Sequence, residues 1–587
     1  MRKYSSNKKA FAMMFVALVL ILAACGNSED RGPTSNSSAQ GEPNVGGIVV
    51  GAMETAPTGM FNPIFYEEAY DEAILRITHE GLVGQNDELE FIPKLAKSWE
   101  MNEDQTSITF HLEEGVNWHD GEQFTAEDVV FTYQTMSDPD YVKSGGFRTE
   151  YVQDLKGYDA YNAGETDDFE GVIADDKYTV TFNFEEPNVT PLYTAGFQII
   201  PKHVFTDTPI ADMPKSDASL KGGSIIGTGP FKLTKIVDRQ QYVFERNDDY
   251  WQGKPHLDKI VYKIVDEASM TGLLENGDID FVADPNGVSP ADYNTVKNIE
   301  DMQIIEQPEF GNQFLGFKMN HRSSSDIESR TINPDNWAVN EKIADPKVRQ
   351  AIAYAVNREG IVNGLLYGKG QKTNSTIAQQ FWAYSEDGVV DYEYDIEKAT
   401  QLLDEAGYLD KDGDGFRENP DGEKWVLNLD FPTGNKIRER SAPLIKQQLE
   451  EAGIQINMRQ PKEMTAYIDG LENRDSDWDL YLLGWALSSH DPDPASLWSA
   501  TAPYNYSRWN NPEADALLEK AMKAPAAFEQ DYRAEVYKEW QALFSKDLPA
   551  LFLYVKDNLW VMSDRVEGID PLPFTIMNNT HEWWVTR

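Results

Sequence analysis

Three aspartates alternate with other residues in one short stretch of the chain and could together bind a cation. They are Asp410, Asp412 and Asp414. With Gly415 they match positions 1, 3, 5 and 6 of a calcium-binding loop, and Asp421 falls at position 12. Calcium needs clustered oxygen ligands of this kind, so the spacing supports a calcium site. However, Pro420 precedes position 12, position 8 is not apolar and no helix pattern follows, which favours a glycine-rich hairpin turn. Both interpretations stay open.

Catalytic chemistry finds little support in the sequence. The chain contains no His-Glu-x-x-His, no Gly-x-Ser-x-Gly and no phosphate-binding loop, and the stretch 364–370 has a lysine but the wrong glycine spacing. His119 lies in the turn predicted at 118–121, where we interpret it as structural. Carboxylates are so abundant that any single pair of them carries little weight. The sequence therefore predicts that the protein is not an enzyme and needs no cofactor.

The single cysteine of the chain has a position that predicts lipid attachment. Cys25 ends the sequence Leu-Ala-Ala-Cys, which follows basic residues and a 14-residue apolar run at 11–24. That run is too short to span a bilayer comfortably, and the layout is typical of a secretory signal peptide over 1–24. Leu-Ala-Ala-Cys is similar to the lipobox of bacterial lipoproteins, in which the leader is removed and the cysteine acylated. We therefore expect an acyl chain such as palmitate on Cys25, and no thiol left for catalysis, metal binding or a disulfide.

Residues 25–47 are small, polar and poor in aliphatic side chains, so we expect a disordered linker behind the lipid anchor. The folded part is predicted to begin near Ile48. No later stretch reaches about 18 apolar residues, so the lipid is the only expected attachment to the membrane. This combination predicts a protein held on the extracellular face of the cell membrane.

Length and charge limit the classes of function. The roughly 540 residues that follow the linker are enough for two or three domains. The net charge of −46 argues against nucleic acid as a partner and against electrostatic attraction to anionic lipid. It favours solubility or the steering of cationic solutes, and the sequence does not separate these two effects.

The periodicity of apolar residues predicts a mixed α/β protein. Alternating apolar residues at 108–112 and 178–184 predict strands, and Thr125 with Asp128 predicts the capping box of a helix between them. In the second half, Asp345-Pro346 predicts a helix start, and Gly407 and Gly453 predict helix ends. Strands are predicted to follow at 454–458, 480–483 and 551–555, so helices and strands alternate there.

A series of short motifs connects the chain to a known family. The first four are Leu95-Ala96-Lys97-Ser98-Trp99, Ile108-Thr109-Phe110-His111-Leu112, Gly115 to Gly121 and Phe124 to Phe131. Further motifs follow in the same order at 227–231, 247–255, 274–280, 348–352, 357–362, 484–485 and 583–584. In this order the chain resembles the family 5 extracellular solute-binding proteins, the peptide- and nickel-binding receptors of ABC importers. Within the family it looks most like the App-type oligopeptide-binding lipoproteins of Gram-positive bacteria.

The resemblance implies an α/β, two-lobed fold of the periplasmic-binding-protein kind (type II, cluster C) with an extra domain on the first lobe. Carried over, the first lobe would comprise 46–70, 193–318 and 557–587, the extra domain 71–192 and the second lobe 319–556. The chain would then cross between lobes near 318 and 556, and these crossings would form a hinge. Such a hinge would let the lobes close on a ligand.

The resemblance also implies a peptide site between the lobes. By family position it would comprise Tyr66, Glu67, Glu68, Tyr70, Phe314, Trp485, Ala486, Leu487, Ser488 and Asp491. For Trp485 and Phe314, packing in the core is the alternative role. Enteric relatives carry an aspartate for the peptide's α-amino group where this chain has Ser488, and an arginine where it has Leu482. These differences suggest longer peptides or another anchor, and Asp491 and Asp493 lie close enough to be considered as substitutes.

The implied function is an oligopeptide receptor that binds the peptide main chain and delivers its cargo to an ABC permease with its ATPase subunits. We expect it to act as a monomer. Two alternatives remain open: a receptor for another solute, such as a nickel complex or an oligosaccharide, and a surface hydrolase.

Overall fold

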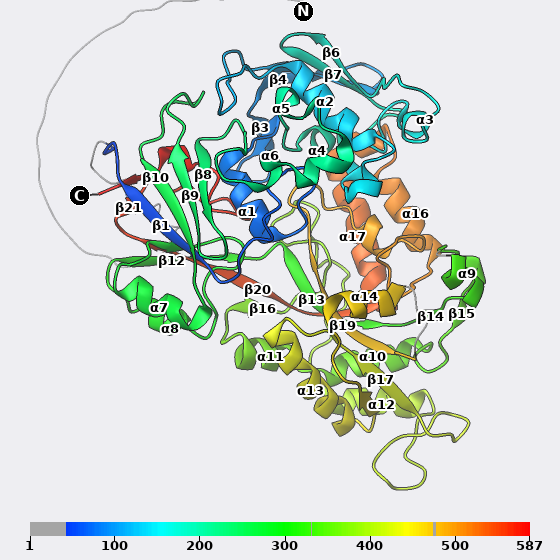
Figure 1. The fold of residues 1–587 in the computed structure, drawn as a ribbon. Coiled ribbons are helices and arrows are strands. Elements are labelled where there is room, and N and C mark those ends of the chain that lie inside the picture. The colour runs from blue at the N-terminus through cyan, green and yellow to red at the C-terminus, as the bar shows by residue number, and fades with distance from the viewer. Residues whose placement is uncertain (1–42, 330, 473–476, 587) are drawn as a thin grey trace, which may run out of the picture. The chain divides into compact units, whose positions relative to one another are not determined.

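The computed structural model describes residues 43–329, 331–472 and 477–586. In this part of the chain, twelve strands join one mixed sheet, whose longest strand, β20, runs through the middle of the molecule (Figure 1). The order along the sheet is β18 (Gln455–Met458), β17 (Val426–Asp430), β19 (Leu480–Ala486), β13 (Gly311–Phe317), β20 (Ala550–Ser563), β11 (Phe281–Val282), β1 (Ile48–Met53), β10 (Lys259–Ile264), β9 (Gln241–Arg246) and β8 (Phe231–Val237). Two more strands, β12 (Met302–Pro308) and β16 (Gly370–Gln371), pair with β20 off this path.

A second, antiparallel sheet lies above the first in the view of Figure 1. Its order is β4 (Ala96–Met101), β5 (Ser107–Leu112), β7 (Thr179–Asn183) and β6 (Val172–Asp176). Three two-stranded ribbons complete the described strands: β2 (Val83–Gln85) with β3 (Phe91–Pro93), β14 (Asn320–His321) with β15 (Ala338–Val339), and β21 (Val566–Glu567) with β22 (Trp584–Val585).

The helices divide between the two halves of the chain. The first half contains α1 (Ala69–Thr78), α2 (Ala126–Ser137), α3 (Tyr158–Asn162), α4 (Pro191–Ala195), α5 (Lys202–Phe205), α6 (Asp217–Leu220), α7 (Glu267–Glu275) and α8 (Tyr293–Val296). The second half contains α9 (Ser324–Ser329), α10 (Pro346–Ala355), α11 (Arg358–Leu365), α12 (Ile396–Glu405), α13 (Lys436–Glu451), α14 (Met464–Glu472), α15 (Ala495–Trp498), α16 (Pro512–Ala521) and α17 (Gln530–Asp547).

The predicted helix boundaries are confirmed by their local chemistry. Thr125 and Asp128 form the capping box of α2, and the Asp345 side chain accepts from the Lys347 N–H at the start of α10. Gly407 and Gly453, just after α12 and α13, both have a φ of +83°, a left-handed conformation that glycine adopts without strain.

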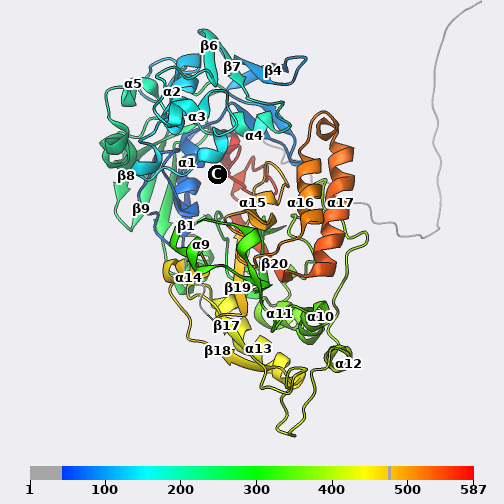
Figure 2. The same cartoon turned by 90° about the vertical axis from the view of Figure 1, so that its right-hand side faces the viewer.

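The second lobe has apolar layers on both faces of its strands. Leu315 and Leu482 pack in a core with α10–α13, whereas the neighbouring Phe314 and Leu483 pack in a second core with α16 and α17. Because side chains alternate along a strand, β19 is apolar at nearly every position, and in β13 the apolar side chains begin at Phe314. Figure 2 shows α16 and α17 on one side of β20 and α10–α13 below it.

The first lobe and the extra domain have separate cores. One core joins β1, β8–β10 and the C-terminal Trp583, and a second joins the four-stranded sheet to α2. Helix α1, most of which falls within the range 71–192 expected for the extra domain, packs its Ile74 and Leu75 into the first-lobe core.

The start of the fold lies where the linker expected at 25–47 and the first lobe expected from residue 46 overlap. Strand β1 begins at Ile48, but Gly46 N–H donates to His256 O at 2.7 Å and Gly47 N–H donates to Asp258 Oδ2 at 2.9 Å. These bonds tie the last residues of the predicted linker to the first lobe. Cys25, the leader and linker residues 26–42 lie outside the described residues. Among the helices described, none combines the length and apolar character needed to cross a bilayer.

Candidate functional site

The two lobes share strand β20, which changes its partner half-way along. Residues 550–554 pair with β13 of the second lobe, and residues 557–563 pair with β12 of the first. Because β12 ends at Pro308 and β13 begins at Gly311, the chain passes between lobes at Glu309 and Phe310. The boundary expected at 318 lies one strand later, after β13, whose apolar residues pack with α10–α13 and with α16 and α17. The other crossing, predicted near 556, falls within β20.

Strand β19 presents part of one edge without a strand partner. It pairs with β13 along its whole length, but with β17 only at Leu480 and Tyr481. Among the described residues, no strand pairs with the second edge from Leu483 to Ala486. Leu487 N–H then donates to Phe310 O at 2.8 Å, which ties the end of β19 to the passage between lobes. Such an edge can add an extended chain through main-chain hydrogen bonds.

A close contact explains the glycine on this edge. Gly484 lies opposite Gln313, and a Cβ at position 484 would stand 2.1 Å from Gln313 Nε2. The Gln313 amide oxygen accepts from Arg438 Nε at 3.1 Å and Nη2 at 2.9 Å. Arg438 Nη1 is buried without a partner among the described residues. No sequence pattern pointed to Arg438, because its approach to Gln313 depends on how α13 packs.

The two predicted aromatics have different positions. Trp485 is half-buried, with ring centroids 5.7 Å from both Tyr504 and Tyr506, and its Nε1 has no partner among the described residues. Phe314 is 0% exposed and packs against the rings of Tyr481 and Trp498. Phe314 is therefore a core residue in this structure, which is the alternative role. Because side chains alternate along a strand, that of Phe314 points to the layer that packs against α17.

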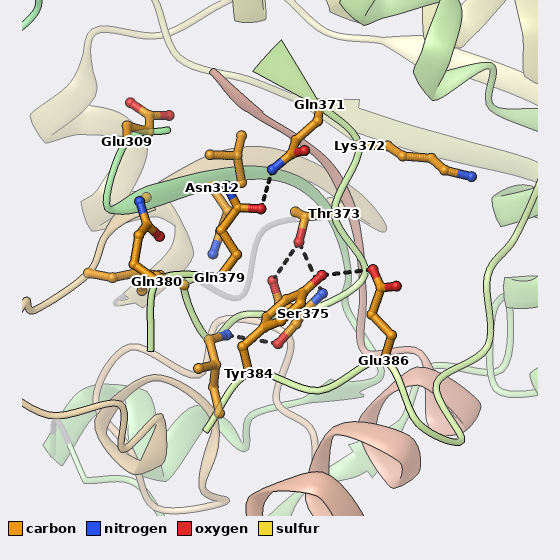
Figure 3. A pocket seen from close by; sticks show the side chains of 15 residues that line it. Glu309, Asn312, Gln371, Lys372, Thr373, Ser375, Gln379, Gln380, Tyr384 and Glu386 are labelled. Atoms are coloured by element: carbon orange, nitrogen blue, oxygen red, sulfur yellow. Dashed lines mark hydrogen bonds between the residues drawn. The ribbon is translucent and has the colours of Figure 1, made fainter. Parts of the chain in front are cut away.

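A polar pocket of about 240 Å³ opens beside the passage between lobes (Figure 3). Glu309 and Asn312 line it from the passage and β13, and Gln380 and Tyr384 line it from the loop after β16. Leu487, which follows β19, forms part of the same wall. The pocket therefore adjoins the free edge of β19. Apart from Leu487, its residues were not predicted, because no local pattern brings 309–312 together with 371–386.

The predicted first-lobe segment surrounds the start of α1. The Arg148 guanidinium lies 4.3 Å from the centre of the Tyr66 ring and donates to Tyr66 O at 3.1 Å. Tyr70 O–H donates to Glu54 Oε1 at 2.9 Å, and burial raises the pKa of Tyr70 to about 12. Glu67 and Glu68 are exposed. In the part of the chain that the structure describes, this segment shares no hydrogen bond or ring contact with 485–488.

Other residues join the extra domain to the second lobe directly. Gln85 Nε2 donates to Ser489 O at 2.7 Å, and the His490 ring stacks on Phe91 with centroids 6.0 Å apart. The Tyr193 ring approaches His490 edge-on at 5.8 Å. Burial, with a smaller contribution from the charge of Arg76, lowers the pKa of His490 to about 4. His490 is thus uncharged at neutral pH and packs as an aromatic ring between the lobes.

Comparison with protein families decides the classification. The model of the bacterial extracellular solute-binding proteins, family 5, matches residues 90–507, which is more than half of the chain. The chain belongs to this family. Its fold is accordingly α/β and two-lobed, and the family consists of solute-binding proteins.

Individual relatives match nearly end to end. The family 5 protein described here is 29% identical to the oligopeptide-binding protein AppA of Bacillus subtilis over 99% of each chain. The structure of that AppA in complex with a nonapeptide superposes with a TM-score of 0.72, at 28% identity, over 93% of this chain and 100% of AppA. NikZ of Campylobacter jejuni, solved with Ni(L-His), shares the fold with a TM-score of 0.71 at 23% identity, over 91% of this chain and 99% of NikZ.

Asp491 of this family 5 protein is engaged by a cation of its own chain. Its oxygens accept from Arg533 Nη1 at 2.9 Å and from Arg533 Nη2 at 2.8 Å. Burial, together with the nearby charge of Asp491, raises the pKa of Asp493 to about 7. The Asp491 charge is therefore already balanced, and Asp493 still holds its proton in about half of the molecules at neutral pH. Neither aspartate offers a free, fully ionised carboxylate to an amine.

The two positions at which this chain differs from enteric relatives, Ser488 and Leu482, carry uncharged side chains. Ser488 is exposed, and its Oγ accepts from the His490 N–H at 3.0 Å. Leu482 is buried in the core between β19 and α10–α13. Any fixed anchor for a peptide terminus must therefore come from elsewhere in this chain.

The three aspartates of the calcium candidate do meet, but they stabilise a turn. One oxygen from each of Asp410, Asp412 and Asp414 lies within 4.8 Å of the others, and all three residues are exposed. Asp410 accepts from Gly413 N–H at 2.7 Å and from Gly415 N–H at 3.1 Å, while Asp412 and Asp414 each accept from the amide two residues on. Asp421 is not part of the cluster. The loop projects beyond α12 in both views, as the hairpin interpretation describes (Figures 1 and 2).

His119 is bound on both ring nitrogens to the backbone. Its Nε2 lies 3.0 Å from Gly229 O, and its Nδ1 accepts from the Gly227 N–H at 3.1 Å. Burial lowers the pKa of His119 to about 4. This histidine joins the turn at 118–121 to the motif at 227–231.

Proposed function

We propose that this protein is an extracellular receptor, lipid-anchored through Cys25, that binds oligopeptides and delivers them to an ABC importer. Its partners would be the membrane permease and its ATPase subunits. The observation that carries the proposal is the near full-length similarity to AppA, which was crystallised with a nonapeptide. The family assignment and the absence of catalytic motifs from the sequence both favour binding without chemistry.

The free edge of β19 supports a mechanism of main-chain recognition. An extended peptide beside Leu483 to Ser488 would gain hydrogen bonds that do not depend on its sequence. Each bond contributes roughly 0.5–1.5 kcal/mol net, so several of them with some apolar burial reach micromolar affinity, about −8 kcal/mol. Trp485 and Leu487 would supply the apolar surface. The segment from Tyr66 to Tyr70 would face the peptide from the first lobe.

The shared strand β20 supports closure by a hinge. The lobes would rotate about Glu309–Phe310 and about the middle of β20, where the partner strand changes. Contacts such as Gln85 with Ser489 would form on closing. The closed form would then dock on the permease as a monomer.

A second candidate ligand is a nickel complex, because NikZ shares the fold. Tryptophan fluorescence during successive additions of mixed tryptic peptides, oligosaccharides and nickel with histidine separates these solutes. We expect a saturable change with peptides alone. A response to nickel or sugar without one to peptides would contradict the proposal. Mass spectrometry of the added peptides should show no cleavage, and new fragments would instead support a surface hydrolase.

The lipid anchor has its own test. We expect the Cys25→Ser variant to be released into the medium, whereas the natural chain stays with the membrane and incorporates labelled palmitate. Retention of the variant on membranes to the same extent would contradict anchoring through Cys25.

A further inference from the structure

We propose that the pocket beside the passage between lobes binds a cationic group of the guest peptide, an ammonium or a guanidinium. This inference rests on the proposed function, because it assumes that the guest is a peptide. It defines a chemical preference that main-chain recognition alone does not provide.

The pocket contains more hydrogen-bond acceptors than donors without partners. Among the described residues, Glu309 Oε1, Asn312 Oδ1 and Gln380 Oε1 are buried acceptors with no partner, and Asn312 Nδ2 is the one such donor in the pocket wall. Asn312 is only 1% exposed. Gln380 Nε2 donates to Pro308 O at 2.7 Å, which fixes which end of that amide is the acceptor. A buried polar atom without a partner is costly, so a ligand rich in donors is favoured here.

The cations of the wall leave this acceptor surplus in place. Lys556 Nζ lies 3.5 Å from Glu309 Oε2, so the other oxygen, Oε1, stays available. Lys372 Nζ binds Asp391 Oδ2 at 2.6 Å. A lysine ammonium carries three donors and no acceptor, and its bond to a carboxylate is charge-assisted. The net charge of −46 also favours the approach of cationic peptides.

The size and the walls suit one side chain. At about 240 Å³ the pocket is smaller than the roughly 300–1,000 Å³ typical of sites for whole small molecules. Ile377, Ala378 and Val555 add apolar surface beside the polar groups, as the alkyl stem of a lysine or arginine requires. Leu487 joins the pocket to the segment proposed to run beside the peptide. A peptide on the β19 edge would therefore place one side chain in the pocket.

Calorimetric titration of the purified chain with alanine-rich nonapeptides tests this inference. Each peptide carries a single lysine, norleucine or glutamate, and the position of that residue is varied along the peptide. N-acetylated copies distinguish binding of the side chain from binding of the terminal amine. We expect lysine to bind about tenfold more tightly than norleucine at one position, the effect of one charge-assisted hydrogen bond. In Glu309→Gln that ratio should fall to within about twofold.

Glu306→Gln is the matched control, because Glu306 lies on the adjoining strand and binds Lys369 Nζ at 2.7 Å outside the pocket. It should keep the lysine preference. If N-acetylation weakens binding to the natural chain and to Glu306→Gln but not to Glu309→Gln, the bound cation is the peptide's own amine. If acetylation weakens binding equally in all three proteins, the amine binds outside the pocket. Equal affinities for lysine and norleucine at every position, or a preference for glutamate, would overturn the inference alone. No binding by any peptide would overturn the proposed function with it.

Discussion

At the scale of single residues, a charged side chain near the site can be paired with a partner that lies far away in the sequence. Asp491 was predicted to contact peptide, yet Arg533 binds both of its oxygens from a helix 42 residues away. Sequence position can predict that a carboxylate lies near the site. Whether that carboxylate is free to bind a ligand depends on which helix packs against it. The same limit hid Glu309, Asn312 and Gln380, which come together only in the folded chain.

Removing the cation of this pair should destabilise the fold. Arg533→Met leaves Asp491 half-buried without its partner, so we expect the free energy of unfolding to fall by about 3 kcal/mol in urea titrations. Lys538→Met, on the same helix and paired with Glu535 at the surface, should change the free energy of unfolding far less, because exposed ion pairs contribute little. A loss of equal size in both variants would contradict a special role for Arg533.

Asp493 should make stability depend on pH. Its pKa is raised to about 7 when folded, by burial and by Asp491, from the ordinary value of 3.8. The unfolded chain therefore loses this proton first, and the contribution of Asp493 to stability is present at low pH and lost as the pH rises toward 7. Asp493→Asn removes this loss. The stability of the variant relative to the natural chain should therefore rise between about pH 4 and 7 and stay constant above about pH 7. A difference that is flat over this range would contradict the shifted pKa.

Among the secondary-structure elements, the sequence predicted helices and strands better than their assignment to lobes. Caps and periodicity predicted α2, α10 and α12, because these signals are local. The boundary expected at 318 came from the family resemblance, and it lies one strand after the passage at Glu309 and Phe310, because β12 and β13 both pair with β20. Only the packed cores show that β13 belongs to the second lobe.

Filling the space at Gly484 should disturb the edge of β19. In Gly484→Ala the new Cβ would meet Gln313 Nε2 at 2.1 Å and Asn312 O at 2.7 Å, so β13 and β19 must shift. We expect a loss of roughly 1–3 kcal/mol in the free energy of unfolding and weaker peptide binding. Gly364→Ala, inside α11 with open space around the new Cβ, should instead gain about 0.5–1 kcal/mol and bind normally. Unchanged peptide binding in Gly484→Ala would contradict a site on this edge.

At the scale of the whole molecule, contacts between the lobes should control peptide binding. Gln85 Nε2 links the extra domain to Ser489 O, whereas Lys436 and Glu267 form an exposed ion pair across the lobes. Gln85→Leu should weaken peptide binding about threefold by disfavouring the closed form, without loss of the fold. Lys436→Met should change binding little, because exposed ion pairs contribute little. X-ray scattering without peptide should show a larger radius of gyration for Gln85→Leu only.

The proposed mechanism is recognition of an extended peptide through its main chain. The most direct measurement is calorimetric titration with a nonapeptide and with copies that are N-methylated at alternate residues. We predict micromolar binding of the parent peptide and at least tenfold weaker binding when the methylated amides are those that face Leu483 to Ser488. Equal affinity for the parent and every methylated copy would contradict the account, as would no heat from any peptide while a nickel complex or a sugar binds.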